Sequence, residues 1–246
     1  MEKVSLENPV SATLDCLDAT RQLWDVVVIG AGPTGSLSAR QLALAGADVL
    51  LVDRLSFPRS KVCGCCLNGR AVSILEQAGV LEDVHAAGAV SLTAFELRAG
   101  RQSLTLSLPT SLSLSRKKLD ALLARTAIAA GAAFLPETEA RLGPLTRDYR
   151  EVLLTQHADA VSVRGKVVLV CEGLNQRLLS RTKEFSNDVD EHSFIGAGAV
   201  TRLKSGVFKE GTIFMVVGRA GYVGAVLVED GFLNLAAALK IGRAHV

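Results

Sequence analysis

The pattern of apolar positions near the start of the chain predicts a strand, a helix and a second strand. Residues 26–29 are all β-branched, which is typical of a strand buried on both faces of a parallel sheet. Residues 36–45 carry apolar residues at helical spacing, and Gly46 is expected to end that helix. Residues 47–52 predict the second strand, which delivers Asp53 at its end.

The rest of the chain continues this mixture. Helical patterns end at glycines, and alternating apolar and polar residues predict several strands. The predicted elements are helices over 70–78 and 116–130, a strand pair over 90–108, short strands over 133–170 and strand pairs over 194–239. Turns are expected at 218–221 and 229–231, where glycines cluster with charged residues. The fold class expected is therefore α/β, or α+β as a whole.

Glycines at a fixed spacing join the first strand to its helix. Gly30, Gly32 and Gly35 form a G-x-G-x-x-G pattern that also contains Pro33 and Thr34. The first glycine permits a tight turn, the second lets the backbone approach a pyrophosphate, and the third allows close packing of helix on strand. The helix N-terminus then offers N–H groups and a positive dipole end to the anion.

An acid completes this pattern. Asp53 ends the second strand roughly 20 residues beyond the glycines, where its carboxylate can accept hydrogen bonds from ribose hydroxyls. Strand, helix, second strand and acid occur in register. We therefore predict a dinucleotide site here rather than a glycine turn without a ligand.

Composition narrows the function classes. Apolar residues make up 49% of the 246 residues, enough for a substantial core, and 21% are charged, so global disorder is not expected. Aromatic residues account for 4% and the net charge is +2. The chain therefore offers neither many rings for base stacking nor a basic field, and nucleic acid is not an expected partner.

The cysteines do not indicate a disulfide framework. There are five, an odd number, and the first 23 residues mix charged and apolar residues in a pattern of neither a secretory nor a transit peptide. Apolar runs are far shorter than the ~20 residues of a membrane-spanning helix. We therefore expect a reduced, cytoplasmic protein without a membrane span.

The segment after Asp53 favours FAD over NAD. It runs Arg-Leu-Ser-Phe-Pro-Arg-Ser-Lys-Val-Cys-Gly, where a simple NAD domain would start its next helix. With the glycine turn, this segment resembles the flavoprotein monooxygenase superfamily, and within it the geranylgeranyl reductase and halogenase branch. The matching residues are Asp53, Arg54, Phe57, Pro58, Arg59, Lys61, Cys63 and Gly64.

Three later segments extend the resemblance over about residues 24–239. They are Ser115-Arg116 with Leu119-Asp120, the strand end at Glu172-Gly173, and residues 222–231 with Asn234. The resemblance puts Arg116 beside the flavin. Glu172 replaces the aspartate usual in relatives, so a contact with the pyrophosphate and a plain strand-end turn both stay open.

The resemblance implies a Rossmann-like FAD-binding sheet beside a mostly antiparallel substrate sheet. It implies FAD as cofactor, NADPH or NADH as a transient reductant, and a small lipophilic or aromatic substrate. Nearby cations would stabilise a reduced, anionic flavin, but Arg59 is the one most expected to be ordinary solvated surface charge. The cofactor-binding residues expected are Gly30, Gly32, Pro33, Thr34, Gly35, Asp53, Arg54, Lys61, Cys63, Gly64, Arg116, Glu172 and Gly173.

The run Cys63-Gly64-Cys65-Cys66 allows three interpretations. A zinc site would need further well-spaced ligands, so no metal is expected. A redox dithiol could pass electrons to a flavin, or small polarisable residues could line a tight loop against its ring. Cys63, Cys65 and Lys61 are the catalytic candidates.

The domain organisation expected has four parts. They are a loosely ordered lead-in at 1–22, an FAD-binding domain at 23–189 that lends 88–109 to the substrate layer, a partial substrate domain at 190–239, and a tail at 240–246. The tail resembles an in-frame read-through of a sequencing adapter, so we expect a chain truncated at its C-terminus.

The leading hypothesis is an FAD-dependent monooxygenase or geranylgeranyl-reductase-like enzyme. No Ser/His/Asp set is apparent, because the four histidines (His85, His157, His192 and His245) stand alone in the sequence. Halogenation is the weaker branch, since Trp24 is the single tryptophan. An NAD(P)-dependent dehydrogenase and a non-catalytic nucleotide-fold binding protein stay open. The sequence leaves the oligomeric state undecided.

Overall fold

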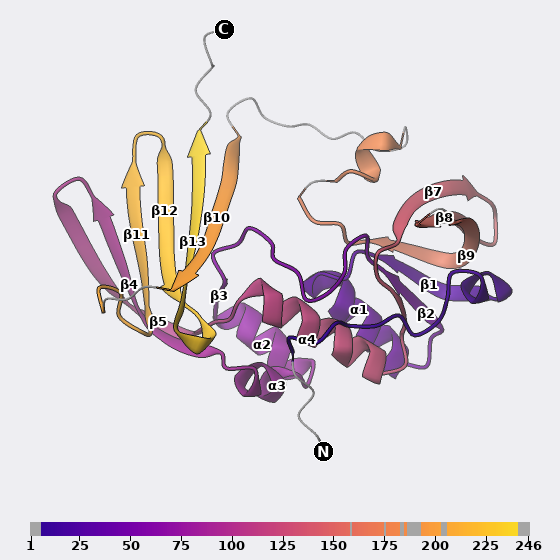
Figure 1. The fold of residues 1–246 in the computed structure, drawn as a ribbon, viewed down its shortest axis with the longest axis horizontal. Coiled ribbons are helices and arrows are strands. Elements are labelled where there is room, and N and C mark those ends of the chain that lie inside the picture. The colour runs from indigo at the N-terminus through magenta and orange to yellow at the C-terminus, as the bar shows by residue number, and fades with distance from the viewer. Residues whose placement is uncertain are drawn as a thin grey trace, which may run out of the picture. The chain divides into compact units, whose positions relative to one another are not determined.

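The computed structural model describes residues 6–157, 159–174, 176–182, 185, 193–202 and 206–240. The chain divides into two compact units, each made of two stretches of sequence. The first unit contains 1–59 and 120–188, and the second contains 60–119 and 189–246. Figure 1 traces the elements of both units by residue number.

The first unit is built on a six-stranded sheet in the order β6-β2-β1-β9-β8-β7 (Figure 1). Its strands are β1 (Leu23–Ile29), β2 (Val49–Val52), β6 (Ala133–Leu135), β7 (Glu139–Leu145), β8 (Arg150–Gln156) and β9 (Asp159–Val170). The four neighbouring strands β6, β2, β1 and β9 run in parallel. Strands β8 and β7 extend the sheet beyond β9 in an antiparallel manner. The predicted βαβ start is confirmed, with β1 between two parallel neighbours.

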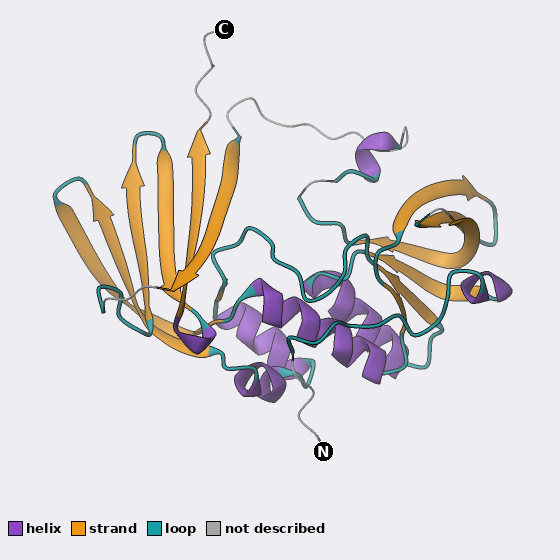
Figure 2. Ribbon diagram, in the orientation of Figure 1, coloured by secondary structure: helices purple, strands orange, loops and turns teal. Residues whose placement is uncertain are grey.

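Both faces of β1 are buried, as its β-branched run predicts. Val26 and Val28 pack into a core with alanines of α1 (Pro33–Leu44) and α4 (Arg116–Ala129). Val27 and Ile29 point to the other face, into a core shared with β8 and β9. In the first unit the helices thus cover one face of the sheet, and the antiparallel extension closes the other (Figure 2).

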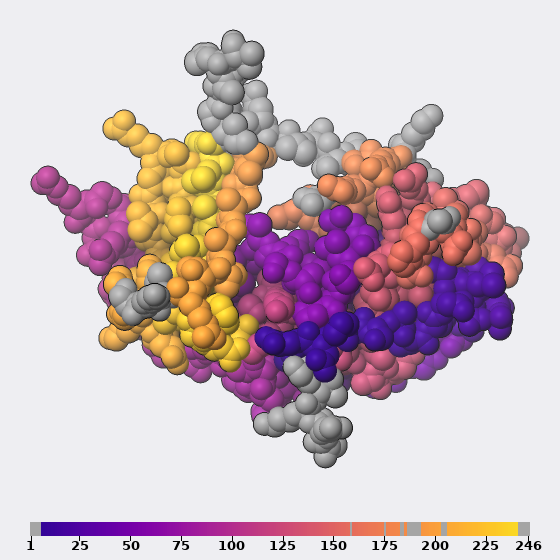
Figure 3. Space-filling model, in the orientation of Figure 1, coloured from indigo at the N-terminus to yellow at the C-terminus, as the bar shows by residue number. Residues whose placement is uncertain are grey.

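The N-terminal segment packs against the first unit, so the expectation of a loosely ordered lead-in is wrong for residues 6–22. Val10 is buried, and its N–H donates to the carbonyl of Phe57 at 3.0 Å. The indole N–H of Trp24 donates to the carbonyl of Ala19 at 2.9 Å, and both residues are buried. A few apolar residues among the polar ones are enough to anchor the segment, drawn in indigo in Figure 3.

The second unit contains a seven-stranded sheet in the order β10-β13-β12-β11-β4-β5-β3. Its strands are β3 (Cys66–Leu67), β4 (Val90–Ala99), β5 (Gln102–Ser113), β10 (Phe194–Arg202), β11 (Thr212–Gly218), β12 (Gly221–Leu227) and β13 (Phe232–Lys240). All its pairs are antiparallel except β4 with β11. The two predicted strand regions therefore join in one mostly antiparallel sheet, as expected.

The division of the chain differs from the expected one at residues 60–119. All of this stretch belongs to the second unit, whereas only 88–109 was expected to contribute there. The reason is local packing, because α2 (Gly69–Gln77) contacts β5 and β3 pairs with the end of β5. The short helix α3 (Leu81–Ala86) was not predicted.

The end of the chain needs one further correction. Lys240 was expected to lie outside the fold, but it is the last residue of β13 and pairs with Phe194. The rest of the proposed read-through tail, 241–246, lies outside the described residues. None of the helices in the described part of the chain combines the length and hydrophobicity needed to span a bilayer.

Candidate functional site

Two glycines of the turn between β1 and α1 leave no room for a side chain. Gly30 has a φ of +103°, and a Cβ at this position would lie 2.5 Å from the carbonyl oxygen of Cys171. A Cβ on Gly35 would overlap the carbonyl oxygen of Gly30 itself. Both positions therefore require glycine, which explains two of the three glycines in the sequence pattern.

The N-terminus of α1 follows directly from this turn. Gly32 is its N-cap residue, with an extended backbone and no side chain to cap the helix, and Pro33 occupies the first turn. The first turn contains no acidic residue. The amides of the first turn, including those of Thr34 and Gly35, have no partner further back in the helix, so this 12-residue helix offers N–H donors and a positive dipole end to an anion.

Asp53 lies beside the turn, at the end of β2. Its side chain is buried, and its two carboxylate oxygens accept hydrogen bonds from the amides of Ala31 at 2.8 Å and Leu55 at 2.9 Å. The carboxylate thus joins the glycine turn to the loop that follows the strand. This is the position from which a ribose could be bound, and that contact stays a prediction.

Arg59 is buried, so the expectation that it is solvated surface charge is wrong. Its side chain is 10% exposed, and its guanidinium lies 3.6 Å from the Asp53 carboxylate and 3.2 Å from that of Asp120. It also stacks 4.8 Å from the ring centroid of Phe57. A buried cation needs paired charges, and two carboxylates supply them here.

Asp120 is the partner that the sequence did not reveal. It was noted only as part of a family motif, yet its side chain is fully buried in the first unit. The signal was present, because an aspartate among the apolar residues of a helix has to find a cation when it is buried. The structure therefore ties two separate sequence motifs together through Arg59.

Glu172 follows the end of β9, next to the glycine turn. Its carboxylate accepts hydrogen bonds from the amides of Leu178, at 2.8 Å, and Leu179, at 3.1 Å. The adjoining Gly173 has a φ of +78°. The side chain therefore organises the following turn of its own chain, and a contact of Glu172 or Gly173 with a pyrophosphate stays a prediction.

The remaining basic candidates differ in their surroundings. Arg54 and Lys61 are exposed, whereas Arg116, the first residue of α4, is half-buried. Lys61 and Arg116 belong to the second unit, and Arg54 belongs to the first. Their contacts with a cofactor stay predictions.

The cysteine loop, residues 61–66, lies in the second unit and runs into β3, whose first residue is Cys66. The carbonyl of Cys63 accepts a hydrogen bond from the side-chain amide of Asn234 at 2.9 Å. Hydrogen bonding from Cys65, together with the cation of Arg116, lowers the pKa of Cys63 to about 5 although burial opposes the shift. Gly64 is exposed and has no protein atom within 4 Å of where a Cβ would lie.

A second long-range contact holds the start of α4. Glu229 is buried and accepts hydrogen bonds from both the amide and the hydroxyl of Ser115, the amide at 2.8 Å. The same hydroxyl accepts from the amide of Lys118, in the manner of a helix cap. The predicted turn at 229–231 thus fixes the helix that begins with Arg116.

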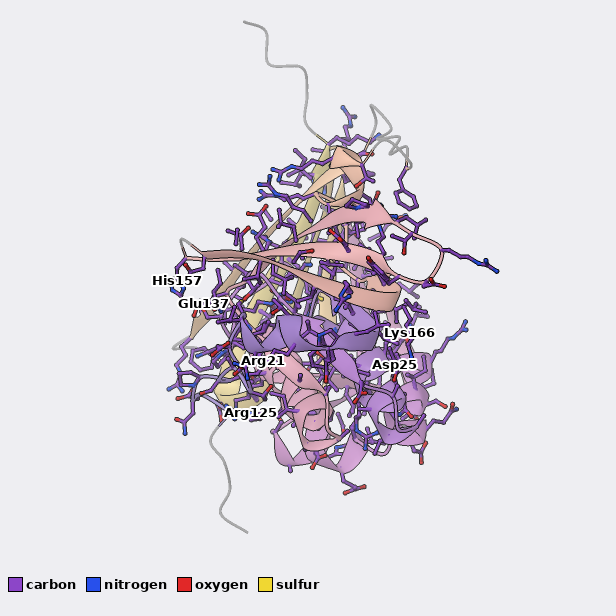
Figure 4. The ribbon with its side chains drawn as sticks, turned by 90° about the vertical axis from the view of Figure 1, so that its right-hand side faces the viewer. Arg21, Asp25, Arg125, Glu137, His157 and Lys166 are labelled. Atoms are coloured by element: carbon purple, nitrogen blue, oxygen red, sulfur yellow. The ribbon has the colours of Figure 1, made fainter. Side chains whose placement is uncertain are left out.

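Histidine and metal chemistry find little support in the described residues. His85 and His157 are exposed, and Figure 4 shows His157 at the tip of the hairpin between β8 and β9. His192 and His245 lie outside the described residues. Within the described ranges no group of three or more His, Cys, Asp and Glu side chains could hold a metal ion.

The family comparison agrees with this geometry. The model of a family described as "FAD binding domain" matches residues 24–184, which is most of the chain and includes the glycine turn, Asp53, Arg59 and Glu172.

Two curated relatives match in part. A menaquinone reductase from Mycobacterium tuberculosis is 55% identical over 56 residues, which cover 23% of this chain and 14% of that protein. A digeranylgeranylglycerophospholipid reductase from Methanosphaera stadtmanae is 29% identical over 160 residues, which cover 63% of this chain and 40% of that protein. The chain thus matches less than half of either relative's length.

Solved structures share the fold over most of the chain. A geranylgeranyl bacteriochlorophyll reductase-like protein from Thermoplasma acidophilum has a TM-score of 0.74 and 21% identity, covering 92% of this chain and 58% of its own. A myxobacterial chondrochloren halogenase has a TM-score of 0.75 and 19% identity, covering 89% of this chain and 53% of its own. At these identities the likeness shows the fold alone.

Proposed function

This chain belongs to the FAD-binding domain family, and on that premise we propose that it forms part of an FAD-dependent oxidoreductase acting on a small molecule. One observation carries the proposal. At the glycine turn the backbone leaves no room for a side chain at Gly30 or Gly35, and the carboxylate of Asp53 lies against the amide of Ala31. Such a turn can receive a pyrophosphate on bare amides and a ribose on an acid.

The residues of the first unit fit the adenine half of FAD. The first-turn amides of α1, among them those of Thr34 and Gly35, would bind the pyrophosphate, and Asp53 would accept from ribose hydroxyls. Arg59 and Asp120 would keep the loop after β2 in place, because their ion pair anchors it to α4. When bound, FAD supplies hydride acceptance and delivery, and the protein supplies binding and orientation.

We place the reaction on the reductase side of the family. The relative that matches 63% of the chain is a digeranylgeranylglycerophospholipid reductase, and the menaquinone reductase is also named as a reductase. The substrate class proposed is a lipophilic molecule with an isoprenoid chain, and the reductant proposed is NADPH or NADH. A monooxygenase acting on an aromatic molecule is the alternative that the same fold allows.

The binding part of the proposal is tested with the purified chain and three nucleotides. FAD, FMN and NAD⁺ are titrated while protein fluorescence is followed. We expect FAD to bind at least about tenfold more tightly than FMN, because FMN lacks the adenosine and pyrophosphate that the first unit is shaped to hold. Tighter binding of NAD⁺ than of FAD would overturn the proposal in favour of a dehydrogenase.

A matched pair of variants assigns that affinity to the site. Asp53→Asn keeps the shape of the side chain but removes the charged acceptor, so FAD affinity should fall by about tenfold. Asp48→Asn removes an exposed acid just before the same strand and should leave the affinity unchanged. An equal effect of both substitutions would mean that net charge, and not the site, governs binding.

The redox part is tested by mixing the flavin-loaded chain anaerobically with NADPH or NADH. Loss of the visible flavin absorbance shows electron transfer, and its recovery on adding a soluble isoprenoid alkene, but not an aromatic phenol, supports a reductase. Recovery only with oxygen and the phenol would support the monooxygenase alternative. Failure of both nicotinamides would favour a protein that binds FAD without using it.

A further inference from the structure

Three of the five cysteines lie within four residues of the second unit, and their surroundings differ. Cys63 is half-buried, Cys65 is buried at 5% exposure, and Cys66 is exposed. The other two, Cys16 and Cys171, lie in the first unit. The cysteine loop therefore brings three thiols together in three environments, which could give them different reactivity.

The backbone folds Cys65 back onto Cys63. Cys65 has a φ of +58°, in the left-handed region that tightens a turn. Its amide donates to the sulfur of Cys63 at 3.4 Å, and its thiol donates to the carbonyl of Cys63 at 3.7 Å. Asn234, which is also buried, holds that carbonyl from the neighbouring β13.

Cys66 takes no part in this arrangement. Its thiol donates to the carbonyl of Gly64 at 3.2 Å, and the structure gives it no hydrogen bond with Cys63. Although Cys66 is exposed as a residue, the protein atoms around its sulfur partly desolvate the thiol and raise its pKa to about 11, and the neighbouring thiolate of Cys63 adds to this shift. Cys66 is thus a weak nucleophile at neutral pH, although it is the most exposed of the three.

Cys63 has the opposite character. Donors from Cys65 and the cation of Arg116 lower its pKa to about 5, so it is a thiolate at neutral pH. The pKa of Cys65 is raised, first by its hydrogen bond to Cys63 and then by burial. One member of the pair is therefore charged and nucleophilic, and the other keeps its proton.

We propose that Cys63 and Cys65 form a redox-active thiol pair, in which a peroxide oxidises Cys63 and Cys65 resolves the product as a disulfide. In the first step the Cys63 sulfur attacks the peroxide, so that an S–O bond forms and the O–O bond breaks. The products are a sulfenic acid on Cys63 and hydroxide, which takes a proton from solvent to become water. The sulfur loses two electrons and the peroxide gains them.

In the second step the Cys65 sulfur attacks the oxidised sulfur of Cys63. An S–S bond forms and the S–O bond breaks, and the hydroxyl leaves as water with the proton of the Cys65 thiol. No other redox partner is required. The site needs no flavin, so it stands or falls independently of the proposed FAD chemistry.

Peptide mass spectrometry of the full chain tests the assignment. Trypsin cuts after Lys61 and Arg70, which releases all three thiols on one peptide. The reduced protein is treated with hydrogen peroxide and then alkylated with iodoacetamide. We expect two of the three thiols to escape alkylation and the peptide to have lost two hydrogens, as a disulfide requires. Reduction with dithiothreitol should restore the two hydrogens and make both thiols available for alkylation again.

Three serine variants distinguish the roles. Cys63→Ser should abolish the disulfide, and Cys65→Ser should leave a sulfenic acid on Cys63 that dimedone traps. Cys66→Ser, the matched control, should form the disulfide like the unmodified chain. Loss of the disulfide in Cys66→Ser, or its persistence in Cys63→Ser, would overturn the assignment of the pair.

A pH profile of the unmodified chain guards against variants that fail to fold. The rate at which iodoacetamide modifies Cys63 should reach half its maximum near pH 5, whereas that of Cys66 should still be rising at pH 9. A midpoint for Cys63 at about 8.5, the value of a free cysteine, would contradict the proposal.

Discussion

The glycine turn of the first unit and the cysteine loop of the second unit carry the candidate chemistry, and they are built in different ways. The glycine turn is made by backbone contacts within one βαβ unit and its neighbouring strand β9. The cysteine loop is held by side chains far away in sequence, such as Asn234, which lies 171 residues beyond Cys63. A local backbone geometry leaves a recognisable sequence pattern, whereas a distant side-chain contact does not.

The largest expected effect comes from filling the glycine turn. Gly35→Ala puts a methyl group onto the carbonyl of Gly30, which neither backbone segment can avoid without moving. We expect a loss of about 3 kcal/mol in the free energy of unfolding and a fall of at least about tenfold in FAD affinity. Urea unfolding and FAD titration measure the two effects.

Gly218→Ala is the control for this substitution. No protein atom lies within 4 Å of a Cβ at Gly218, and its φ lies outside the region that strains other residues. Its unfolding free energy should stay within about 0.5 kcal/mol of the unmodified chain. Equal losses for both variants would show that the glycine turn is no more sensitive to an added methyl group than another glycine position.

The next effect concerns the buried charges beside the turn. Arg59→Met removes the cation that pairs with both Asp53 and Asp120 and leaves two buried carboxylates without it. Breaking a buried pair in this way costs about 3 kcal/mol. Arg54→Met is the matched control, because that arginine is exposed and should change FAD affinity with little effect on stability.

If Arg54→Met destabilised the protein as much as Arg59→Met, the buried pair would not be what holds the loop. If neither changed stability, the contrast between buried and exposed charge drawn from the structure would be wrong. Thermal unfolding at neutral pH decides between these outcomes.

Much of the first unit could be predicted from sequence, because β-branched runs, glycines and a terminal acid each impose a local geometry. The burial of Arg59 could not be predicted, since it depends on Asp120. That residue lies on α4, in the other stretch of sequence that makes up the first unit. The packing of the lead-in was missed for a similar reason. Val10 and Ala19 are isolated apolar residues without periodicity, and the hydrogen-bond partner of Val10, Phe57, is distant in sequence.

The second unit shows the same limit more strongly. Its long strands were predicted from alternation and two of its turns from glycine, and the structure contains both, whereas the short strand β3 was not predicted. The contacts that position the cysteine loop and α4, Asn234 with Cys63 and Glu229 with Ser115, link residues with no pattern in common. Only the fold brings these pairs together.

A smaller effect is expected from breaking the contact that holds the cysteine loop. Asn234→Ala removes the amide donor and leaves the Cys63 carbonyl with only the weak thiol donor of Cys65, and losing such a hydrogen bond costs about 1 kcal/mol. Asn234→Asp should cost more, because a buried carboxylate would face a carbonyl oxygen and could not donate to it. Urea unfolding of the three proteins gives the comparison, and an aspartate variant as stable as the unmodified chain would contradict the hydrogen bond.

The smallest effect is expected for the ion pair between Lys166 and Asp25, which Figure 4 shows on the first unit. The two side chains lie 2.7 Å apart and are both partly exposed, so water and salt screen their attraction. The hydrogen bond from Lys166, with one from the Asp48 amide, lowers the pKa of Asp25 below its usual 3.8. Any stabilisation from this carboxylate is therefore present above that value and is lost as the pH falls below it.

Lys166→Met should accordingly leave the thermal midpoint at pH 7 almost unchanged, and any difference should shrink as the pH is lowered from 7 towards 2 and Asp25 takes up a proton. Thermal unfolding at the two pH values measures this. A fall at pH 7 as large as that of Arg59→Met would mean that exposure does not separate the two ion pairs. The two ion pairs have similar distances between opposite charges, 3.2 Å for Arg59 with Asp120 and 2.7 Å for Lys166 with Asp25. They differ in their access to solvent, because water can replace a lost partner in the exposed pair but not in the buried one.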